Sequence, residues 1–166
     1  LKYIKQLQRY IKKYKPVVLC INLNESIPIE MIDAFVACHE IRMMMESSFY
    51  PKLDKPIILP LSRSPKDIQS LLKLTKVLDY GLRVERGSFL CTENGCILSA
   101  PFALMYAISI ATSGRAKNIF IAGADGYSLH DSRQLEMIEM LEQYKVTSGA
   151  IPLTAITPTT YPINCV

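Results

Sequence analysis

Residues 118–127 read NIFIAGADGY, a short apolar run that passes directly into a loop with two glycines. Isoleucine and phenylalanine followed by Gly and Asp are typical of a strand that ends in a tight turn. Residues 17–23, VVLCINL, are apolar almost throughout, which suits a strand covered on both faces. The two stretches predict buried strands of a parallel sheet, each followed by a polar loop.

Further segments extend this alternation along the chain. Strands that alternate with helices of about ten to fifteen residues imply right-handed crossovers. For 166 residues we therefore predict one α/β domain of three layers, with a largely parallel sheet in Rossmann-like order. The polar stretch 83–95 fits this pattern least and is either a lid or an extra strand pair. The other expected elements are strands at 34–38, 56–61 and 150–156 and helices at 64–77, 100–112 and 132–144.

Two of the expected helices carry start signals. Ser99 is a candidate N-cap for the nearly all-apolar helix at 100–112, which has Pro101 in its first turn, where a missing N–H costs nothing. Asp131 and Gln134 have the spacing of a capping box before the helix at 132–144. The apolar helix is expected to be the buried central one.

Composition bounds the class of protein. Hydrophobic residues make up 49% of the chain and charged residues 20%, with a mean hydropathy of +0.17. These values are typical of a globular chain and exclude intrinsic disorder, collagen-like repeats and a disulfide-dense miniprotein. The longest apolar run, 97–112, contains serines and a proline and falls short of the roughly 18 uninterrupted residues of a membrane span. We therefore expect a soluble protein.

The five cysteines are an odd number, and Cys20 and Cys38 lie inside apolar runs that are predicted strands. Reduced thiols are therefore favoured over a disulfide framework, which indicates a cytoplasmic compartment. Cys91 and Cys96 are the only close pair, with no second pair of Cys or His beside them. This spacing predicts no metal site.

The net charge of +4 is concentrated at the start of the chain. Residues 1–15 hold six basic side chains and no acidic one, and the rest of the chain has 13 basic against 15 acidic residues. Ile4, Leu7, Ile11 and Tyr14 recur at helical spacing, so this segment is predicted to form an amphipathic helix. Its basic face is either a solvated surface or a contact for a membrane surface or another polyanion. Arg-rich clusters with interleaved aromatics are missing elsewhere, so no nucleic-acid partner is expected.

The candidate site residues are those that follow the predicted strands. In a parallel sheet, ligands bind beyond the carboxyl ends of the strands, where helix N-termini present free N–H groups. The polar residues at these positions are Asn22 and Asn24, His39, residues 62–64, and the loop 123–127.

Each candidate also has a reading that needs no ligand. Asn22 and Asn24 point to the same side of a strand end and could read a base edge or a sugar, although Asn is common in turns. Gly123 and Gly126 would let backbone amides approach a ligand while the Asp125 carboxylate points at hydroxyl groups or a metal, yet glycines are ordinary in turns. Position alone leaves both readings open.

The remaining candidates are aromatic, hydroxyl and imidazole groups. Tyr127 offers a ring that stacks on a base or a phenol that donates to a phosphate, and it equally suits a half-buried turn. Ser99 lies at an expected helix N-terminus, where a phosphate would dock. His39 and His130 are candidates for acid–base chemistry near neutral pH, or else surface residues at helix starts. The sequence has no Walker A motif, nucleophile elbow, H-E-x-x-H or G-x-G-x-x-G, which disfavours the enzymes built on them.

Short motifs spread over most of the chain resemble one enzyme family. They are 20–24 (CINLN), 97–99 (ILS) before the apolar helix, 118–127, His130 before the next helix, and 157–158 (TP). Together they resemble the bacterial sialyltransferases of glycosyltransferase family 42. They also resemble the sialyltransferase-like domains attached to aldolase barrels of the HMG-CoA-lyase type in surface-polysaccharide pathways, of which lipopolysaccharide biosynthesis is one.

The resemblance implies a site for a CMP-sugar across the strand ends. Asn22 of the C-x-N element and Ser99 would contact the nucleotide or the donor sugar, Tyr127 would hold the phosphate, and His130 would be the general base. No cofactor beyond the CMP-sugar donor is implied. The predicted binding residues are Asn22, Asn24, Ser99, Asp125, Gly126 and Tyr127.

The sequence departs from the family at three points. The family's first strand and its G-x-G-P-S phosphate loop would precede the first helix, where this sequence begins. His39 stands where the family has a second Asn, and one tyrosine rather than two lies near the loop. The departures predict either a C-terminal part of a longer chain, with a linked aldolase domain, or a domain that is not a working transferase. The leading hypothesis is a nucleotide-sugar-binding glycosyltransferase-like domain, and the alternative is a non-catalytic module that binds a ligand or partner.

Overall fold

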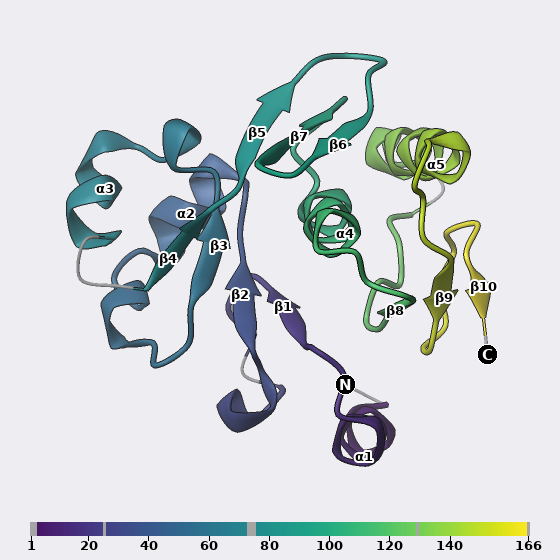
Figure 1. Cartoon of the computed structure of the whole chain (residues 1–166), viewed down its shortest axis with the longest axis horizontal. Coiled ribbons are helices and arrows are strands. Elements are labelled where there is room, and N and C mark those ends of the chain that lie inside the picture. The colour runs from purple at the N-terminus through teal and green to yellow at the C-terminus, as the bar shows by residue number, and fades with distance from the viewer. Residues whose placement is uncertain (1–2, 25, 73–75, 129, 166) are drawn as a thin grey trace. The chain divides into compact units, whose positions relative to one another are not determined.

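The computed structural model describes residues 3–24, 26–72, 76–128 and 130–165 (Figure 1). The chain divides into two compact units, Leu1–Leu82 and Arg83–Val166. Both units interleave helices with parallel strands, so the predicted α/β class with largely parallel pairing and Rossmann-like order is confirmed. No helix in the described part of the chain is long and apolar enough to cross a membrane.

The first unit contains one parallel sheet. Its strands follow one another in chain order, β1-β2-β3-β4, so each new strand is added at the same edge. The helices of this unit are α1 (Ile4–Tyr14), α2 (Glu40–Glu46) and α3 (Lys66–Leu72), with short 3₁₀ turns η1 (Ile29–Met31), η2 (Tyr50–Lys52) and η3 (Leu61–Arg63). Its strands are β1 (Leu19–Ile21), β2 (Ala34–Val36), β3 (Ile57–Leu59) and β4 (Val77–Asp79).

The core of the first unit lies between this sheet and its helices. Strand side chains alternate between the two faces of a sheet, and Phe35, Ile57 and Leu59 point to the face that α2, η2 and α3 cover. All residues of β2 and β3 are buried, which explains their uninterrupted apolar runs. The residues that cover this face are Met43, Tyr50, Ile68 and Leu72.

The second unit contains a parallel sheet and an antiparallel one. The parallel sheet has the order β10-β9-β8, and α5 makes the crossover from β8 to β9. In the other sheet, with the order β5-β7-β6, β6 and β7 form an antiparallel hairpin. The elements are β5 (Gly81–Val84), within which the two units divide, β6 (Leu90–Thr92), β7 (Gly95–Leu98), α4 (Ala103–Ser113), β8 (Ile119–Ile121), α5 (Ser132–Val146), β9 (Leu153–Ala155) and β10 (Asn164–Cys165).

Two helices supply the core of the second unit. Five consecutive residues of α4, from Met105 to Ser109, are buried, as expected for the apolar helix. The phenol of Tyr144 on α5 binds Thr112 Oγ1 at 2.9 Å, accepts from the backbone N–H of Ile151 at 2.8 Å and donates to its carbonyl at 3.2 Å. One buried hydroxyl therefore ties α5 to α4 and to the segment that enters β9.

The element predictions held for most strands and failed at some boundaries. The strands expected at 17–23, 34–38, 56–61, 118–122 and 150–156 are β1, β2, β3, β8 and β9, each three residues long. The helix expected over 64–77 is wrong at its end, because α3 stops at Leu72 and Val77 pairs with Ile57 in the sheet. Residues 73–75 lie outside the described residues. Of the two alternatives for 83–95, a lid or an extra strand pair, the structure has the strand pair: β6 pairs with β7, which extends beyond that stretch to Leu98.

Of the two start signals, one is confirmed and one is wrong. Asp131 is the N-cap of α5 and accepts from the backbone N–H of Arg133 at 3.0 Å. Ser99 does not cap α4, which begins after Phe102; its hydroxyl donates to the carbonyl of Ser88 at 3.3 Å instead. The N-cap position of α4 is taken by Phe102, three residues after Ser99.

Candidate functional site

The predicted site residues are divided between the two units. Asn22, Asn24 and His39 belong to the first unit, and Ser99 belongs to the second. The loop 123–127 and His130 are also in the second unit. The site that can be built from contacts is therefore the one at the carboxyl ends of β8 and β9.

In the first unit, the loop after β1 is held by hydrogen bonds that its backbone N–H groups donate to β2 and to two side chains. Asn22 adopts a left-handed conformation with φ of 56°, which ends the strand, and its N–H donates to Val36 O at 2.8 Å. Asn24 Oδ1 accepts from the N–H of Ser26 at 2.9 Å, the geometry of an Asx turn. Leu23 N–H donates to the buried carboxylate of Glu46 at 3.2 Å, and burial raises the pKa of that carboxylate. The turn role weighed for Asn24 is thus present in the structure.

In the second unit, hydrogen bonds join the loop after β8 (residues 123–127) to the loop after β9 (residues 157–160), and we call this arrangement the latch. Gly123 N–H donates to Thr157 Oγ1 at 2.8 Å, and Thr159 Oγ1 donates to Ala124 O at 2.6 Å. The carbonyl of Asp125 accepts from both the N–H and the hydroxyl of Thr160, at 3.0 and 3.1 Å. The N–H of Gly123, one of the two glycines expected to meet a ligand, and the carbonyls of Ala124 and Asp125 are therefore bonded to the neighbouring loop.

The side chain of Gln134 completes this latch from the first turn of α5. Gln134 is 3% exposed. Its Oε1 accepts from the N–H of Tyr127 at 2.9 Å, and its Nε2 donates to Thr160 Oγ1 at 3.1 Å. Gln134 was expected to return to the helix N-cap, and this half of the capping box is wrong. Its carboxamide bridges the two loops instead.

The exposed side of the latch presents a cation and a ring. The guanidinium of Arg133 lies over the ring of Tyr127, 4.3 Å from its centroid, and pairs with the carboxylate of Asp131 through Nε and Nη2. This pairing lowers the pKa of Asp131. The Tyr127 ring also lies 6.2 Å from that of Phe102, the N-cap residue of α4.

Tyr161 is a second phenol at this site, and sequence analysis missed it. It is 7% exposed, and it interacts electrostatically with Tyr127 and Arg133. Burial, reinforced by Tyr127, raises the pKa of Tyr161 to about 12, so the phenol stays protonated at neutral pH. The signal that could have found it is its place: it follows β9 by six residues, and the loop after β9 lies beside the loop after β8 in a parallel pair.

His130 lies next to this cluster in the sequence, in the turn that leads into α5. Its side chain is exposed. The neighbouring carboxylate, Asp131, is occupied by Arg133 and by the helix N-terminus. If His130 acts as a base oriented by a carboxylate, that carboxylate is therefore not Asp131.

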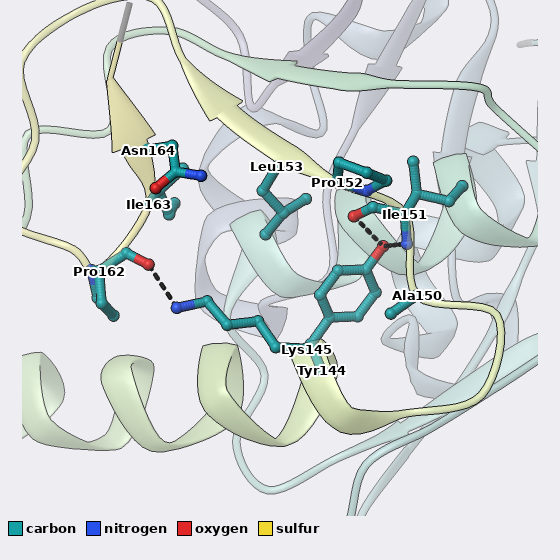
Figure 2. Close-up of a pocket in the computed structure, with 9 residues that line it drawn as sticks. All are labelled: Tyr144, Lys145, Ala150, Ile151, Pro152, Leu153, Pro162, Ile163 and Asn164. Carbon is teal, nitrogen blue, oxygen red and sulfur yellow. Dashed lines mark hydrogen bonds between the residues drawn. The ribbon is translucent and has the colours of Figure 1, made fainter.

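A cavity of about 430 Å³ lies at the opposite edge of the β9–β10 pair, where both strands begin (Figure 2). Two of its polar lining side chains are already bonded: the Tyr144 phenol to Ile151, and Lys145 Nζ to Pro162 O at 2.6 Å. Among the described residues, no group of three or more His, Cys, Asp or Glu side chains could hold a metal ion. The lining residues are Tyr144, Lys145, Ala150, Ile151, Pro152, Leu153, Pro162, Ile163 and Asn164.

Replacement of Gly126 by alanine is expected to open the latch. Gly126 has φ of 98°, and an added Cβ would collide with Thr160 Oγ1. A left-handed alanine costs about 1–2 kcal/mol, and displacement of the Thr160 hydroxyl adds about 1 kcal/mol for a lost hydrogen bond. Gly123→Ala is the matched control, because Gly123 has φ of 71° with nothing near the new Cβ. Urea unfolding should show a larger loss of unfolding free energy for Gly126→Ala than for Gly123→Ala. Equal losses would contradict the latch.

The raised pKa of Tyr161 predicts a loss of stability in alkali. The folded state holds this phenol proton more tightly than the unfolded chain, so the contribution is complete below pH 10 and declines as the pH rises through 12. Between pH 10 and pH 12, the free energy of unfolding of the wild type should fall by about 2 kcal/mol more than that of Tyr161→Phe. Denaturant unfolding at several pH values measures the difference. Tyr14→Phe, at an exposed position of α1, should keep the wild-type pH dependence.

Comparison with known proteins does not assign this chain to a family. No protein-family model matches the sequence, and no curated protein or solved structure does either.

Proposed function

We propose that the chain is a nucleotide-sugar-binding, sialyltransferase-like domain in which the carboxyl ends of β8 and β9 receive the donor phosphate. The observation that carries this proposal is the guanidinium of Arg133 held over the ring of Tyr127, with the buried phenol of Tyr161 in electrostatic interaction with both. Phosphate oxygens accept hydrogen bonds, and all three groups donate them. The resemblance stated for the sequence supplies CMP-sugar as the donor class.

Arg133 retains donors for a ligand although it is paired. A guanidinium has five N–H donors, and Asp131 takes those of Nε and one on Nη2. The side chain of Arg133 is 57% exposed, so a ligand can approach it from solvent. The N-terminus of the 15-residue helix α5 adds a favourable dipole for negative charge.

The proposed roles follow from these positions. Tyr161, protonated at neutral pH, donates to a phosphate oxygen, and the faces of Tyr127 and Phe102 offer aromatic surface to the base or sugar. His130 serves as general base for an acceptor hydroxyl, and Asp125 offers an exposed carboxylate to sugar hydroxyls. Asn22, Asn24 and Ser99 are further proposed contacts from the resemblance.

Titration of the full chain with CMP tests the site. The expected result is saturable binding, weakened at least tenfold by Arg133→Gln, since a charge-assisted hydrogen bond contributes about 1.5–3 kcal/mol. Arg115→Gln is the matched control, because Arg115 is an exposed arginine of the same unit paired with Glu93 at 3.8 Å. Calorimetry measures both affinities. Equal binding by the two variants, or tighter binding of a nucleotide other than CMP, would reject the proposed site.

The basic helix supports a second candidate function. Lys5, Arg9, Lys12, Lys13 and Lys15 are all exposed, and none forms an ion pair within the described residues. In the apolar stripe of α1, Ile11 is buried and Ile4 and Leu7 are half-buried, whereas Tyr14 is exposed, so most of the stripe packs against the protein. We propose that α1 contacts an anionic membrane surface by electrostatic attraction, without insertion of the helix.

Sedimentation with phosphatidylserine-containing vesicles tests this contact. Each Lys or Arg near such a surface contributes about 1 kcal/mol, so Lys12→Glu with Lys13→Glu should weaken binding more than tenfold. High salt should weaken wild-type binding in the same way. Lys66→Glu with Lys76→Glu makes the same charge change at exposed positions outside α1. An equal loss with that pair would mean that net charge, rather than α1, causes binding.

A further inference from the structure

The β6–β7 hairpin holds two cysteines face to face. Cys91 on β6 and Cys96 on β7 are directly opposite each other in the antiparallel register, and only the turn of Glu93 and Asn94 separates the two strands. Side chains of directly opposed residues lie on the same face of an antiparallel pair. All five cysteines of the chain lie in the described part, and none is in a disulfide.

The spacing of such a pair matches what a disulfide requires. Opposed residues of an antiparallel ladder have Cα atoms about 4.5 or 5.5 Å apart. Disulfides join residues whose Cα atoms are about 4.4–6.8 Å apart. The bond can therefore form by side-chain rotation, with the hairpin register unchanged.

The surroundings of the two thiols also bring them together. Both interact with the hydroxyl of Ser109, which lies on the buried part of α4. Cys96 is 4% exposed, whereas Cys91 is half-buried and is the more accessible of the two residues. The turn is fixed by Thr92, whose hydroxyl donates to Gly95 O at 2.9 Å, and by Ser113 of α4, whose hydroxyl donates to Thr92 O at 2.7 Å.

We propose that Cys91 and Cys96 are a reversible redox pair that a low-molecular-weight disulfide, such as oxidised glutathione, closes into a cross-strand disulfide. Cys91, the more accessible thiol, reacts first: its thiolate attacks the glutathione disulfide, forms a mixed disulfide and releases one glutathione thiolate. The Cys96 thiolate then attacks the Cys91 sulfur and releases the second glutathione thiolate. The protein loses two protons and two electrons, and one glutathione disulfide becomes two glutathione thiols.

This inference is independent of nucleotide binding and of the membrane contact. Burial raises the pKa of both thiols, that of Cys96 to about 12, so the thiolates are scarce at neutral pH and closure is slow. The pair therefore responds to a sustained oxidising ratio of glutathione rather than to a brief one. Reduced glutathione reverses both steps by the same route.

Equilibration of the full chain with glutathione redox buffers tests the pair. After acid quenching and alkylation, peptide mapping should show a link between Cys91 and Cys96 with the loss of two hydrogen atoms. The equilibrium constant for closure should be at least about tenfold larger in the native protein than in urea, because the hairpin sets the two sulfurs opposite each other before reaction.

Variants make the outcome decisive. Cys91→Ser and Cys96→Ser should each abolish the link, and Cys91→Ser should remain largely unmodified at the buried Cys96. Cys165→Ser removes the exposed thiol near the C-terminus and should close as the wild type does. A native closure constant no larger than that in urea, a stable glutathione adduct on Cys91, or links that join other cysteines would each overturn the proposal. The wild-type map alone decides these points if a variant fails to fold.

Discussion

The buried carboxamide of Gln134 is the constraint on which the second unit's site depends. A carboxamide has one acceptor and one donor end, and here each end serves a different loop: Oε1 takes the N–H of Tyr127, and Nε2 gives to Thr160. The loop after β8, the loop after β9 and the first turn of α5 therefore share one side chain. A buried polar group left without partners costs about 1–3 kcal/mol, so the three segments are stable together.

The same principle explains why the site is made of side chains. Strands β8 and β9 run parallel, and their ladder ends where the N–H of Ile156 donates to Ile121 O, so the peptide groups of residues 123–125 lie beyond the sheet. The threonines at positions 157, 159 and 160 satisfy these groups across the two loops. What remains accessible to a ligand is the outside of this arrangement: the guanidinium of Arg133, the half-buried Tyr127 and the exposed carboxylate of Asp125.

The parts of the fold that depend on local pattern could be predicted from the sequence. Continuous apolar runs identified β1, β2, β3, β8 and β9, and Asp131 was identified as a cap because its position relative to α5 is a local property. Helix α2 was missed because Ile41 and Met43 to Met45 form a run without helical periodicity, and only Met43 among them is buried. Strand β4 was missed because Val77 continues the apolar pattern of the preceding helix, and only pairing with Ile57 distinguishes the two.

The sequence pointed to the loop at which the candidate site lies, but it did not show which side chains come together there. The rule that ligands bind at strand ends pointed to residues 123–127, and those residues do meet the end of β9. The partner of Gln134 depends on how two loops approach each other, and the electrostatic interaction of Tyr161 with Tyr127 depends on the register of β8 with β9. These are non-local facts, which no spacing along the chain contains.

The latch between the two loops has a consequence for how fast and how tightly this edge binds any molecule. Because Gly123, Asp125 and Tyr127 already have their backbone partners, a ligand that arrives finds the main chain in place and has only side chains to immobilise. Each immobilised side chain costs about 0.5–1.5 kcal/mol of entropy, far less than the ordering of a loop of several residues. Binding at this edge should then involve little change in heat capacity from folding, and its rate should follow encounter rather than a conformational step.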